Sequence, residues 1–321
     1  MSGKKAAGAS ERLRVGVDLG GTKIEGAVMD GAGAMLARRR VDTPSGDYAR
    51  TVGAVADLVD ALSSEVAQAG WGEIAVLGVG APGALSPASG LIKNANSTCL
   101  NGRPLDRDLA QATELPIRLA NDANCFALSE AIDGAGAGKS CVFGVILGTG
   151  VGGGIVVDGK PLVGLHAIGG EWGHNPLPDP GELETPGPDC YCGRRGCVEI
   201  WCSGPALTRD YREASGDPVT TVEEVVARAQ DGEWTARKVL GRHLDRLSRA
   251  LASVVNVLDP DVIVLGGGLS NMQHLYRELP KAMRPHIFSD VFETPIAPPA
   301  HGDSSGVRGA AWLWAPDELP G

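Results

Sequence analysis

The chain has 321 residues, of which 43% are hydrophobic, and it carries a formal net charge of −10. This length and composition predict a globular protein with a sizeable core and two lobes, and the negative charge argues against nucleic acid or an anionic membrane surface as a partner. No apolar run approaches the roughly 18 residues that span a bilayer. The start, "MSGKKAAGASER", lacks the apolar stretch of a signal peptide, so we expect a cytoplasmic protein.

The first part of the chain predicts an α/β lobe. Residues 1–12 show no hydrophobic period, and we expect a disordered tail there. From Leu13 onward, "LRVGVDLGG", "TKIEGAVMD" and "GAGAMLARRRVD" are typical of a meander of strands. Residues 47–70 show helical spacing and end in glycine, and "IAVLGVGAPG" then predicts a buried strand. Strand, helix and strand in this order indicate a covered sheet.

The second part repeats this plan. "LPIRLA" predicts a strand, "NDANCFALSEAI" a helix with its cap, and "CVFGVILGTGVGGGIVVDGKPL" a hairpin with a glycine-rich tip. Because this hairpin resembles "VGVDLGGTKIEGAVMD", we expect the lobes to be duplicates. Residues 168–204 are too irregular for strands and predict an insertion ordered by something other than a core. Helices are expected at 221–230 and 235–258, then a strand in "DVIVLGG" and a final helix from near Val307.

Three glycine-rich turns are candidates for nucleotide binding. In "DLGGTK" the glycines let backbone N–H groups approach an anion, while Thr22 and Lys23 add donors, and "LGTGVGGG" repeats this chemistry. An ordinary hairpin explains the glycines but not their neighbours. Two such turns, one in each lobe, favour a nucleotide whose phosphates lie in a cleft between the lobes. A third run, "LGGGLS", ends a buried strand, and a plain strand-to-helix turn explains it equally well.

One further glycine run is a false match. "DGAGAGKS" nearly spells a P-loop, but Asp133 stands where the first glycine belongs. A P-loop follows a strand and opens a helix, whereas this stretch follows a helix and precedes a strand. We therefore expect a surface loop.

A candidate catalytic base lies in "RLANDANCFALSE". Asn121 and Asp122 fall where a strand ends and a helix begins, and either residue is a favoured helix cap. A cap needs only one of them. Phosphoryl transfer to a hydroxyl needs a carboxylate that accepts the proton, with Mg²⁺ and backbone donors neutralising the phosphates. Asp122 suits the base, and Asp18 in the first glycine turn suits a place near the metal.

The stretch "CYCGRRGC" predicts a structural zinc site. Zinc takes four tetrahedral ligands, and Cys190, Cys192 and Cys197 offer three thiolates. His174 is the preferred fourth ligand. Cys202 is the alternative, although its apolar surroundings favour packing. A redox thiol pair and unpaired buried cysteines remain as other interpretations, and the absence of a C-x-x-C at a helix start weighs against the first.

Taken together, these motifs resemble the ROK family of bacterial repressors, open reading frames and kinases, and within it the fructokinases of the manno(fructo)kinase type. The resemblance runs from Val15 to Trp314 and includes "GVDLGGTK", "RLANDANCFALSEA", "GVILGTGVGGG", "GGEWGHNPLP" and "CYCGRRGCVE". It implies an actin-like ATPase fold, in which a ribonuclease H-like α/β lobe is duplicated. It also implies a homodimer, the usual state of proteins in this family. The implied lobes are 13–120 with a C-terminal helix at 303–316, and 121–302 with the zinc-binding insertion.

The resemblance also implies the site residues. Asp122 matches the catalytic base, and one imidazole nitrogen of His174 is expected to bind zinc while the other faces the sugar. The implied sugar ligands are Asn96, Asn121, Asp122, Glu171, His174 and Glu199. The implied nucleotide ligands are Asp18, Gly20, Gly21, Thr22, Lys23, Gly148, Thr149, Gly150, Gly266, Gly267 and Gly268. Cys99 stands where relatives often carry Trp, at the expected pocket wall.

The activity implied is ATP- and Mg²⁺-dependent phosphorylation of the 6-hydroxyl of a hexose. We expect fructose, with glucose, mannose and N-acetylglucosamine as alternatives. A sugar-sensing regulator would carry a helix-turn-helix segment before the first phosphate motif, and the dozen residues before Leu13 are too few for one. A catalytically silent, zinc-stabilised sugar binder would need a damaged base or damaged phosphate turns, and both are intact.

Overall fold

The computed structural model describes residues 12–218 and 221–320, which form two compact units. Unit 1 contains 12–129, 165–167 and 303–320, and unit 2 contains the described residues of 130–164 and 168–302. The predicted tail lies outside the described residues, apart from Arg12, which begins the first strand.

The division after Ser129 falls later than the expected one after residue 120. The reason is the packing of the helix that begins at Asp122. A Cβ built on Gly309 would lie 1.7 Å from the carbonyl oxygen of Cys125, so the two backbones are in direct contact and hold the first part of this helix, residues 122–129, in unit 1.

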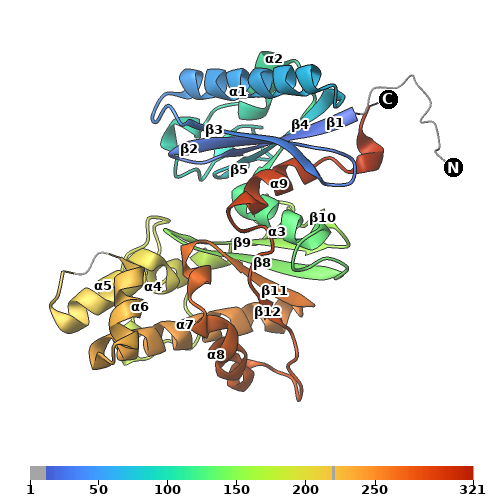
Figure 1. Cartoon of the computed structure of the whole chain (residues 1–321). Helices are drawn as coiled ribbons and strands as arrows, with labels where there is room; N and C mark the ends of the chain where they lie inside the picture. Colours follow the sequence, from blue (N-terminus) through green and yellow to red (C-terminus); the bar gives the residue numbers. More distant parts are fainter. Residues whose placement is uncertain (1–11, 219–220, 321) are drawn as a thin grey trace. The chain divides into compact units, whose positions relative to one another are not determined.

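Unit 1 is built on one mixed sheet (Figure 1). β1 (Arg12–Leu19), β2 (Lys23–Met29) and β3 (Met35–Asp42) form an antiparallel meander, and β4 (Glu73–Ala81) and β7 (Ile117–Asn121) extend the sheet parallel to β1. The order is β3-β2-β1-β4-β7. A separate two-stranded sheet, formed by β5 (Ala84–Leu85) and β6 (Ile92–Lys93), falls between β4 and β7 in the sequence.

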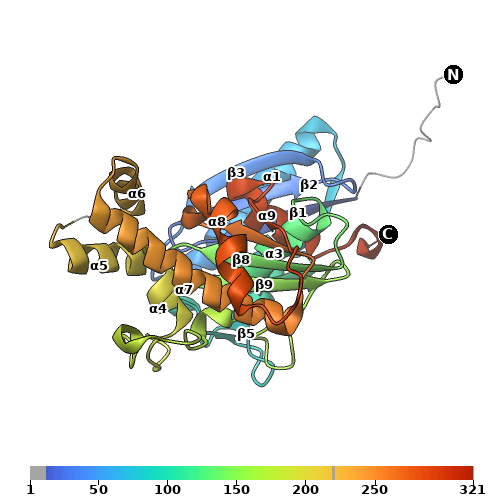
Figure 2. The same ribbon diagram turned by 90° about the horizontal axis from the view of Figure 1, so that it is seen from below.

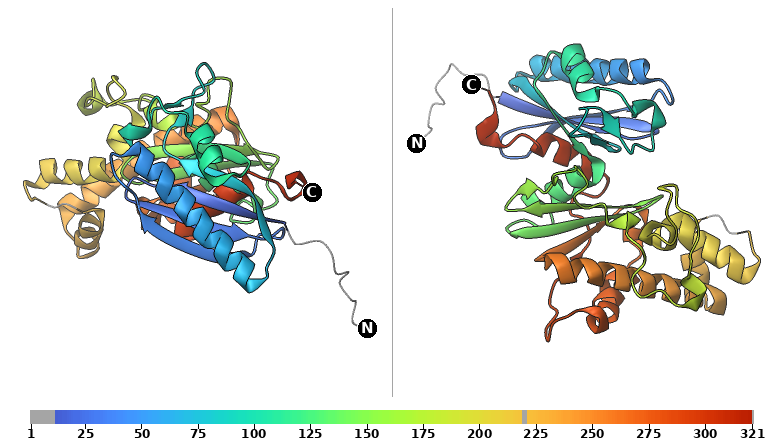
Figure 3. Two further views of the ribbon diagram at one scale, coloured as in Figure 1. Left: turned by 90° about the horizontal axis from the view of Figure 1, so that it is seen from above. Right: turned by 180° about the vertical axis from the view of Figure 1, so that it is seen from behind.

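Helices cover both faces of this sheet, as the continuous burial of β4 requires (Figure 3). α1 (Tyr48–Ala69) and α2 (Leu105–Thr113) lie on one face, and α9 (Ser305–Trp312) lies on the other. α9 can approach the sheet closely because Gly78 on β4 has no side chain. A Cβ there would lie 1.8 Å from the carbonyl oxygen of Ala310. The final helix begins at Ser305, two residues before the expected start near Val307.

Unit 2 repeats the topology of unit 1. β8 (Cys141–Leu147), β9 (Val151–Val157) and β10 (Lys160–Pro161) form the meander, and β11 (Val262–Gly266) and β12 (Ile296–Ala297) follow parallel to β8. The order β10-β9-β8-β11-β12 matches that of unit 1 strand for strand. The predicted duplication is therefore confirmed.

The helices of unit 2 gather around one long helix, α7 (Trp234–Leu258), as Figure 2 shows. α5 (Gly204–Ser215), α6 (Val222–Gln230), α8 (His274–Met283) and the short α4 (Val198–Cys202) all contact it. α3 (Asp122–Ile132) crosses the division between the units. The segment 133–140 that follows it is a chain of turns leading into β8, which confirms that "DGAGAGKS" is no P-loop.

Salt bridges hold the insertion onto α7. It contains short 3-10 turns and isolated bridges among the described residues, with no longer strand. Arg246 and Arg249 bind the Glu184 carboxylate at 2.7 and 2.9 Å, and Arg249 also donates to the carbonyl oxygens of Pro178 and Asp179. These partly buried charges are paired, as burial requires. In the part of the chain that the structure describes, every helix is too short or too polar to cross a membrane.

Candidate active site

Two carboxylates of unit 1 lie at the carboxyl edge of its parallel strands. Asp18 stands near the end of β1, and Asp122 begins α3 directly after β7. Ligands of open α/β sheets bind at this edge. Burial, together with the nearby carboxylates of Asp122 and Glu25, raises the pKa of Asp18 to about 7, against the opposing charge of Arg40.

The cap of α3 does not depend on Asp122. Asn121 Oδ1 accepts a hydrogen bond from the Ala123 N–H at 2.8 Å, and Asn121 Nδ2 donates to the Gly83 carbonyl at 3.2 Å. Asp122 Oδ1 accepts from the same N–H at 2.8 Å, yet its side chain is exposed. Because Asn121 supplies a capping oxygen of its own, the helix cap does not require Asp122.

Carboxylate burial at Asp18 leads to a testable pH dependence. A pKa near 7 in the folded chain, against 3.8 for the unperturbed group, means that ionisation of Asp18 destabilises the fold as pH rises from about 4 to 7. Asp18→Asn should therefore raise the Tm of the ligand-free protein by about 5 °C near pH 8, with a gain that shrinks toward pH 4. Thermal melts at pH 4, 6 and 8 without Mg²⁺ or ATP measure this, and an equal gain at every pH would contradict it.

The first phosphate turn joins β1 to β2. The Gly20 N–H donates to the Lys23 carbonyl at 3.0 Å, and Thr43 Oγ1 donates to the Gly20 carbonyl at 2.8 Å. Neither Gly20 nor Gly21 has a positive φ, so left-handed hairpin geometry does not explain them. A Cβ at Gly21 would meet only Ser97 Oγ at 3.6 Å. Its backbone is exposed together with Thr22 and Lys23, as an anion-binding turn requires.

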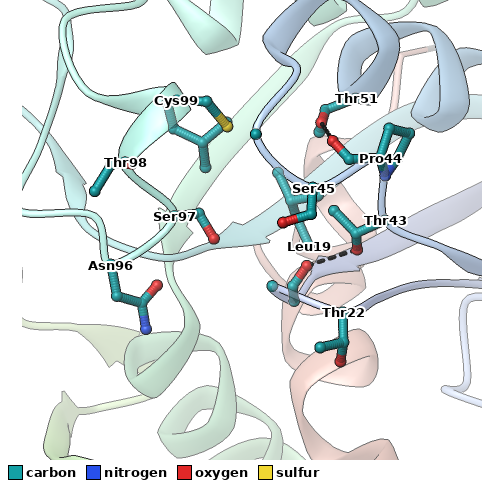
Figure 4. Close-up of a pocket in the computed structure, with 14 residues that line it drawn as sticks. Leu19, Thr22, Thr43, Pro44, Ser45, Thr51, Asn96, Ser97, Thr98 and Cys99 are labelled. Atoms are coloured by element: carbon teal, nitrogen blue, oxygen red, sulfur yellow. Dashed lines mark hydrogen bonds between the residues drawn. The ribbon is translucent and has the colours of Figure 1, made fainter.

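Beside this turn lies a pocket of about 340 Å³ within unit 1. Figure 4 shows Asn96, Ser97 and Cys99 on one side of it, with Ser45 and Thr22 opposite. Its lining contains hydroxyl and amide groups and no charged side chain, which suits a neutral polar ligand. Asn96, predicted to bind sugar, is exposed here, and Cys99 forms part of the wall as expected.

The second phosphate turn, Gly148 to Gly150, joins β8 to β9 in unit 2. Gly204 at the start of α5 donates its N–H to the Gly148 carbonyl at 2.8 Å. Gly267, with φ of 77°, lies against the end of β8, since a Cβ there would sit 2.4 Å from the Leu147 carbonyl. The second and third glycine runs thus lie together at the carboxyl ends of β8 and β11, with Thr149, Gly266 and Gly268 beside them. Gly204 was not among the predicted site residues, although its place at a helix start in "CSGPAL" could have indicated it.

The candidate sugar ligands of unit 2 are seated on β9. Trp172 is buried and donates its indole N–H to the Gly152 carbonyl at 2.9 Å, which fixes the turn that carries exposed Glu171 and half-buried His174. Glu199, on α4, accepts a hydrogen bond at Oε2 from the Val151 N–H at 3.0 Å.

The predicted zinc ligands come together. The ligand atoms of His174, Cys190, Cys192 and Cys197 all lie within 4.8 Å of one another. Cys192 Sγ is 3.6 Å from Cys197 Sγ, and Cys190 Sγ is 3.6 Å from His174 Nδ1. Zinc bond lengths of roughly 2.1 to 2.3 Å in a tetrahedron place ligand atoms about 3.6 to 3.8 Å apart, so the four residues fit the ion.

The alternatives for these cysteines have less support. The four cysteines of this region form no disulfide, which gives no support to a redox pair, and the exposure of Cys192 does not fit a set of buried thiols. Cys202 is fully buried in α4 and stands outside the cluster. Burial raises the pKa of Cys197 to about 12, and a bound cation would reverse this shift by stabilising the thiolate.

His174 differs from expectation in one respect. Its Nδ1 faces the thiols, but its Nε2 lies 3.0 Å from the Tyr191 hydroxyl, where we expected the sugar. The two rings meet edge to face at 5.1 Å. Tyr191 therefore fixes the ring orientation of this candidate ligand, the part that outer-shell partners of metal-bound histidines play. Tyr191, in the middle of "CYCGRRGC", was not among the residues predicted from the sequence.

Two sheets of one strand order, each with candidate ligands at the carboxyl ends of its parallel strands, define an actin-like ATPase fold. This is the predicted fold class. The chain belongs to the ROK family, whose family model matches residues 14–317.

Two kinases are similar to this chain over most of its length. The chain is 38% identical over 301 residues to an N-acetylgalactosamine kinase of Shewanella sp. (strain ANA-3), covering 93% of this chain and 95% of that protein. It is 37% identical over 304 residues to an N-acetyl-D-glucosamine kinase of Haemophilus influenzae (strain 86-028NP), covering 93% and 98%. Neither protein is named as a fructokinase.

Solved structures agree with the fold. A ROK hexokinase from Thermus thermophilus matches with a TM-score of 0.81 and 33% identity, covering 94% of this chain and 97% of that one. A ROK family glucokinase from Streptomyces griseus, in complex with glucose and AMPPNP, matches with a TM-score of 0.72 and 27% identity, covering 94% and 98%.

Proposed function

We propose that this protein is an ATP- and Mg²⁺-dependent kinase that phosphorylates the 6-hydroxyl of an N-acetylated hexosamine, with N-acetylglucosamine as the preferred acceptor. The observation that carries the proposal is the Asp122 carboxylate, which is exposed at the start of α3 and close enough to Asp18 to raise its pKa. Phosphoryl transfer to a sugar hydroxyl needs such a carboxylate as proton acceptor. The similarity to hexosamine kinases supports the acceptor class.

The choice of acceptor departs from our expectation of fructose. Among the alternatives stated from the sequence, N-acetylglucosamine has the better support, because the similar proteins named above act on N-acetylated hexosamines. The uncharged, hydroxyl-lined pocket beside Asn96 is chemically suited to an acetamido group. Glucose and mannose stay as further alternatives.

Each group of residues has a part in this proposal. Asp122 accepts the proton of the attacking hydroxyl. Asn96 and Asn121 are the proposed sugar ligands of unit 1, and Glu171 and Glu199 are those of unit 2. His174 is left to the metal, because its Nδ1 faces the thiols and its Nε2 lies against Tyr191. Mg²⁺, when bound near Asp18, neutralises charge on the transferred phosphate, and the backbone N–H groups of the two glycine turns do the same. Zinc orders the loop that carries Glu171 and His174. The expectations of a cytoplasmic homodimer without nucleic-acid or membrane partners remain predictions.

Comparison of acceptors tests the proposal. With saturating ATP, kcat/KM for N-acetylglucosamine should exceed that for fructose by roughly 100-fold or more, because a site that hydrogen-bonds a particular substituent rejects sugars that lack it. N-acetylgalactosamine, glucose and mannose complete the panel. A higher kcat/KM for fructose would overturn the acceptor class, and turnover with none of these sugars would overturn the kinase.

A further inference from the structure

We propose that Gly150 is a positioning residue for the acceptor sugar: its missing side chain makes room for the Glu199 carboxylate, which docks on the second phosphate turn. This inference rests on the proposed function, in which Glu199 contacts the sugar. This role of Gly150 differs from the phosphate contact that its motif predicts.

The space around the two turn glycines differs. Neither Gly148 nor Gly150 has a positive φ, so backbone conformation requires glycine at neither position. A Cβ at Gly148 would meet nothing within 4 Å. A Cβ at Gly150 would lie 2.7 Å from Glu199 Oε2 and 3.6 Å from its carboxyl carbon, with no other contact within 4 Å beyond its chain neighbours. A side chain at position 150 would therefore have to displace the Glu199 carboxylate and no other group.

The carboxylate of Glu199 is held on one side only. Its Oε2 accepts from the Val151 N–H at 3.0 Å, directly after Gly150. Its Oε1 has no hydrogen-bond partner among the described residues, although the side chain is half buried. Because this oxygen is not occupied by a donor of the described residues, it can accept a hydrogen bond from a ligand hydroxyl.

The same residue of β9 supports the neighbouring ligands. A Cβ at Gly173, one residue before His174, would lie 2.0 Å from the Val151 carbonyl oxygen. The Val151 N–H thus donates a hydrogen bond to Glu199, and the Val151 carbonyl packs against the turn that carries His174. Both acceptor-binding elements of unit 2 are therefore seated on the residue that follows the phosphate turn, and a shift of Glu199 should disturb sugar binding before nucleotide binding.

Calorimetric binding of N-acetylglucosamine without nucleotide tests this. Gly150→Ala should raise the Kd for the sugar by about tenfold or more, as loss of a supporting contact does, while Gly148→Ala, the matched control, should leave this Kd within about twofold of wild type. In a Glu199→Ala background, Gly150→Ala should change the Kd by less than about twofold, because the crowded group is gone. Wild-type sugar affinity in Gly150→Ala, or an undiminished effect in the Glu199→Ala background, would overturn the inference.

Thermal stability provides a readout that does not need the sugar. Gly150→Ala should lower the Tm in the presence of Glu199 and leave it unchanged in the Glu199→Ala background, whereas equal losses in both would show that Glu199 is not the group displaced. If Gly150→Ala fails to fold, Glu199→Asp replaces it: its shorter side chain cannot reach Val151, and it should weaken sugar binding by about tenfold. Wild-type protein that binds no hexosamine would overturn the proposed function instead, and the Tm comparison would still report the contact.

Discussion

Asp122→Asn is expected to lower kcat by roughly 10³-fold while the Kd for the sugar changes by less than about threefold. An amide of the same size retains the hydrogen-bonding shape of the side chain but cannot accept the proton of the attacking hydroxyl. Helix α3 should remain intact, because Asn121 Oδ1 caps it through the Ala123 N–H independently of Asp122. The expected effect is therefore on the chemical step alone.

A coupled assay of ADP release with saturating ATP and sugar measures kcat, and calorimetry measures the sugar Kd. Asp60→Asn is the matched control, since Asp60 is an exposed aspartate on α1, and the same charge change there should leave kcat within about twofold of wild type. Asp122→Asn with near-normal kcat would remove Asp122 as the base. A loss of sugar binding equal to the loss of kcat would make it a ligand instead.

Periodicity predicted the elements of this fold because its strands and helices bury regular faces. The buried residues of α1, from Thr51 to Val66, recur at helical spacing, and Asp47 and Gly70 cap its ends. The likeness of the two glycine-tipped hairpins predicted the duplication, since like patterns of strand and turn form like sheets. The division after Ser129 was not predictable, because it depends on the contact of α3 with Gly309, 184 residues distant from Cys125 in the chain.

The candidate site was predictable where chemistry imposes residue types at short spacing. Three cysteines within eight residues predict a metal site because zinc requires several thiolates. Contacts between segments remote in sequence were not predictable in this way. The position of Gly306 against the Asp18 carboxylate, where a Cβ would sit 2.5 Å from Oδ2, depends on the packing of α9. Gly204 on Gly148 and Tyr191 on His174 are contacts of the same kind.

The acceptor sugar was the least predictable property. Family motifs report the chemistry that ROK kinases share, and for this chain they led to the proposed base at Asp122 and the predicted phosphate turns. Discrimination between sugars depends on the shape of a pocket and on a few hydrogen bonds, which different loop residues supply. Cys99 marks such a position, because it lines the pocket beside Asn96 where a larger residue would fill space.

Cys192→Ser is expected to abolish stoichiometric zinc binding and to lower the Tm by about 5 to 10 °C. Cys192 is the exposed member of the cluster, so replacement of its sulfur by oxygen removes almost no packing. A loss of stability in this variant must therefore come from the metal. Sugar affinity should fall by roughly tenfold to 100-fold, because in our proposal zinc orders the loop that carries Glu171 and His174.

Metal analysis of the purified protein, thermal melts and sugar calorimetry measure the three effects. Cys141→Ser is the matched control: Cys141 is partly buried at the start of β8, outside the cluster, and its variant should retain one zinc per chain.

Acidification should release the metal from the wild type, because protons compete for thiols whose pKa burial has raised, as it does for Cys197. Glu199 should keep its place on Val151 without zinc, since that hydrogen bond involves no ligand of the cluster. Wild-type protein without bound zinc, or Cys192→Ser with unchanged Tm and sugar affinity, would refute a structural zinc site.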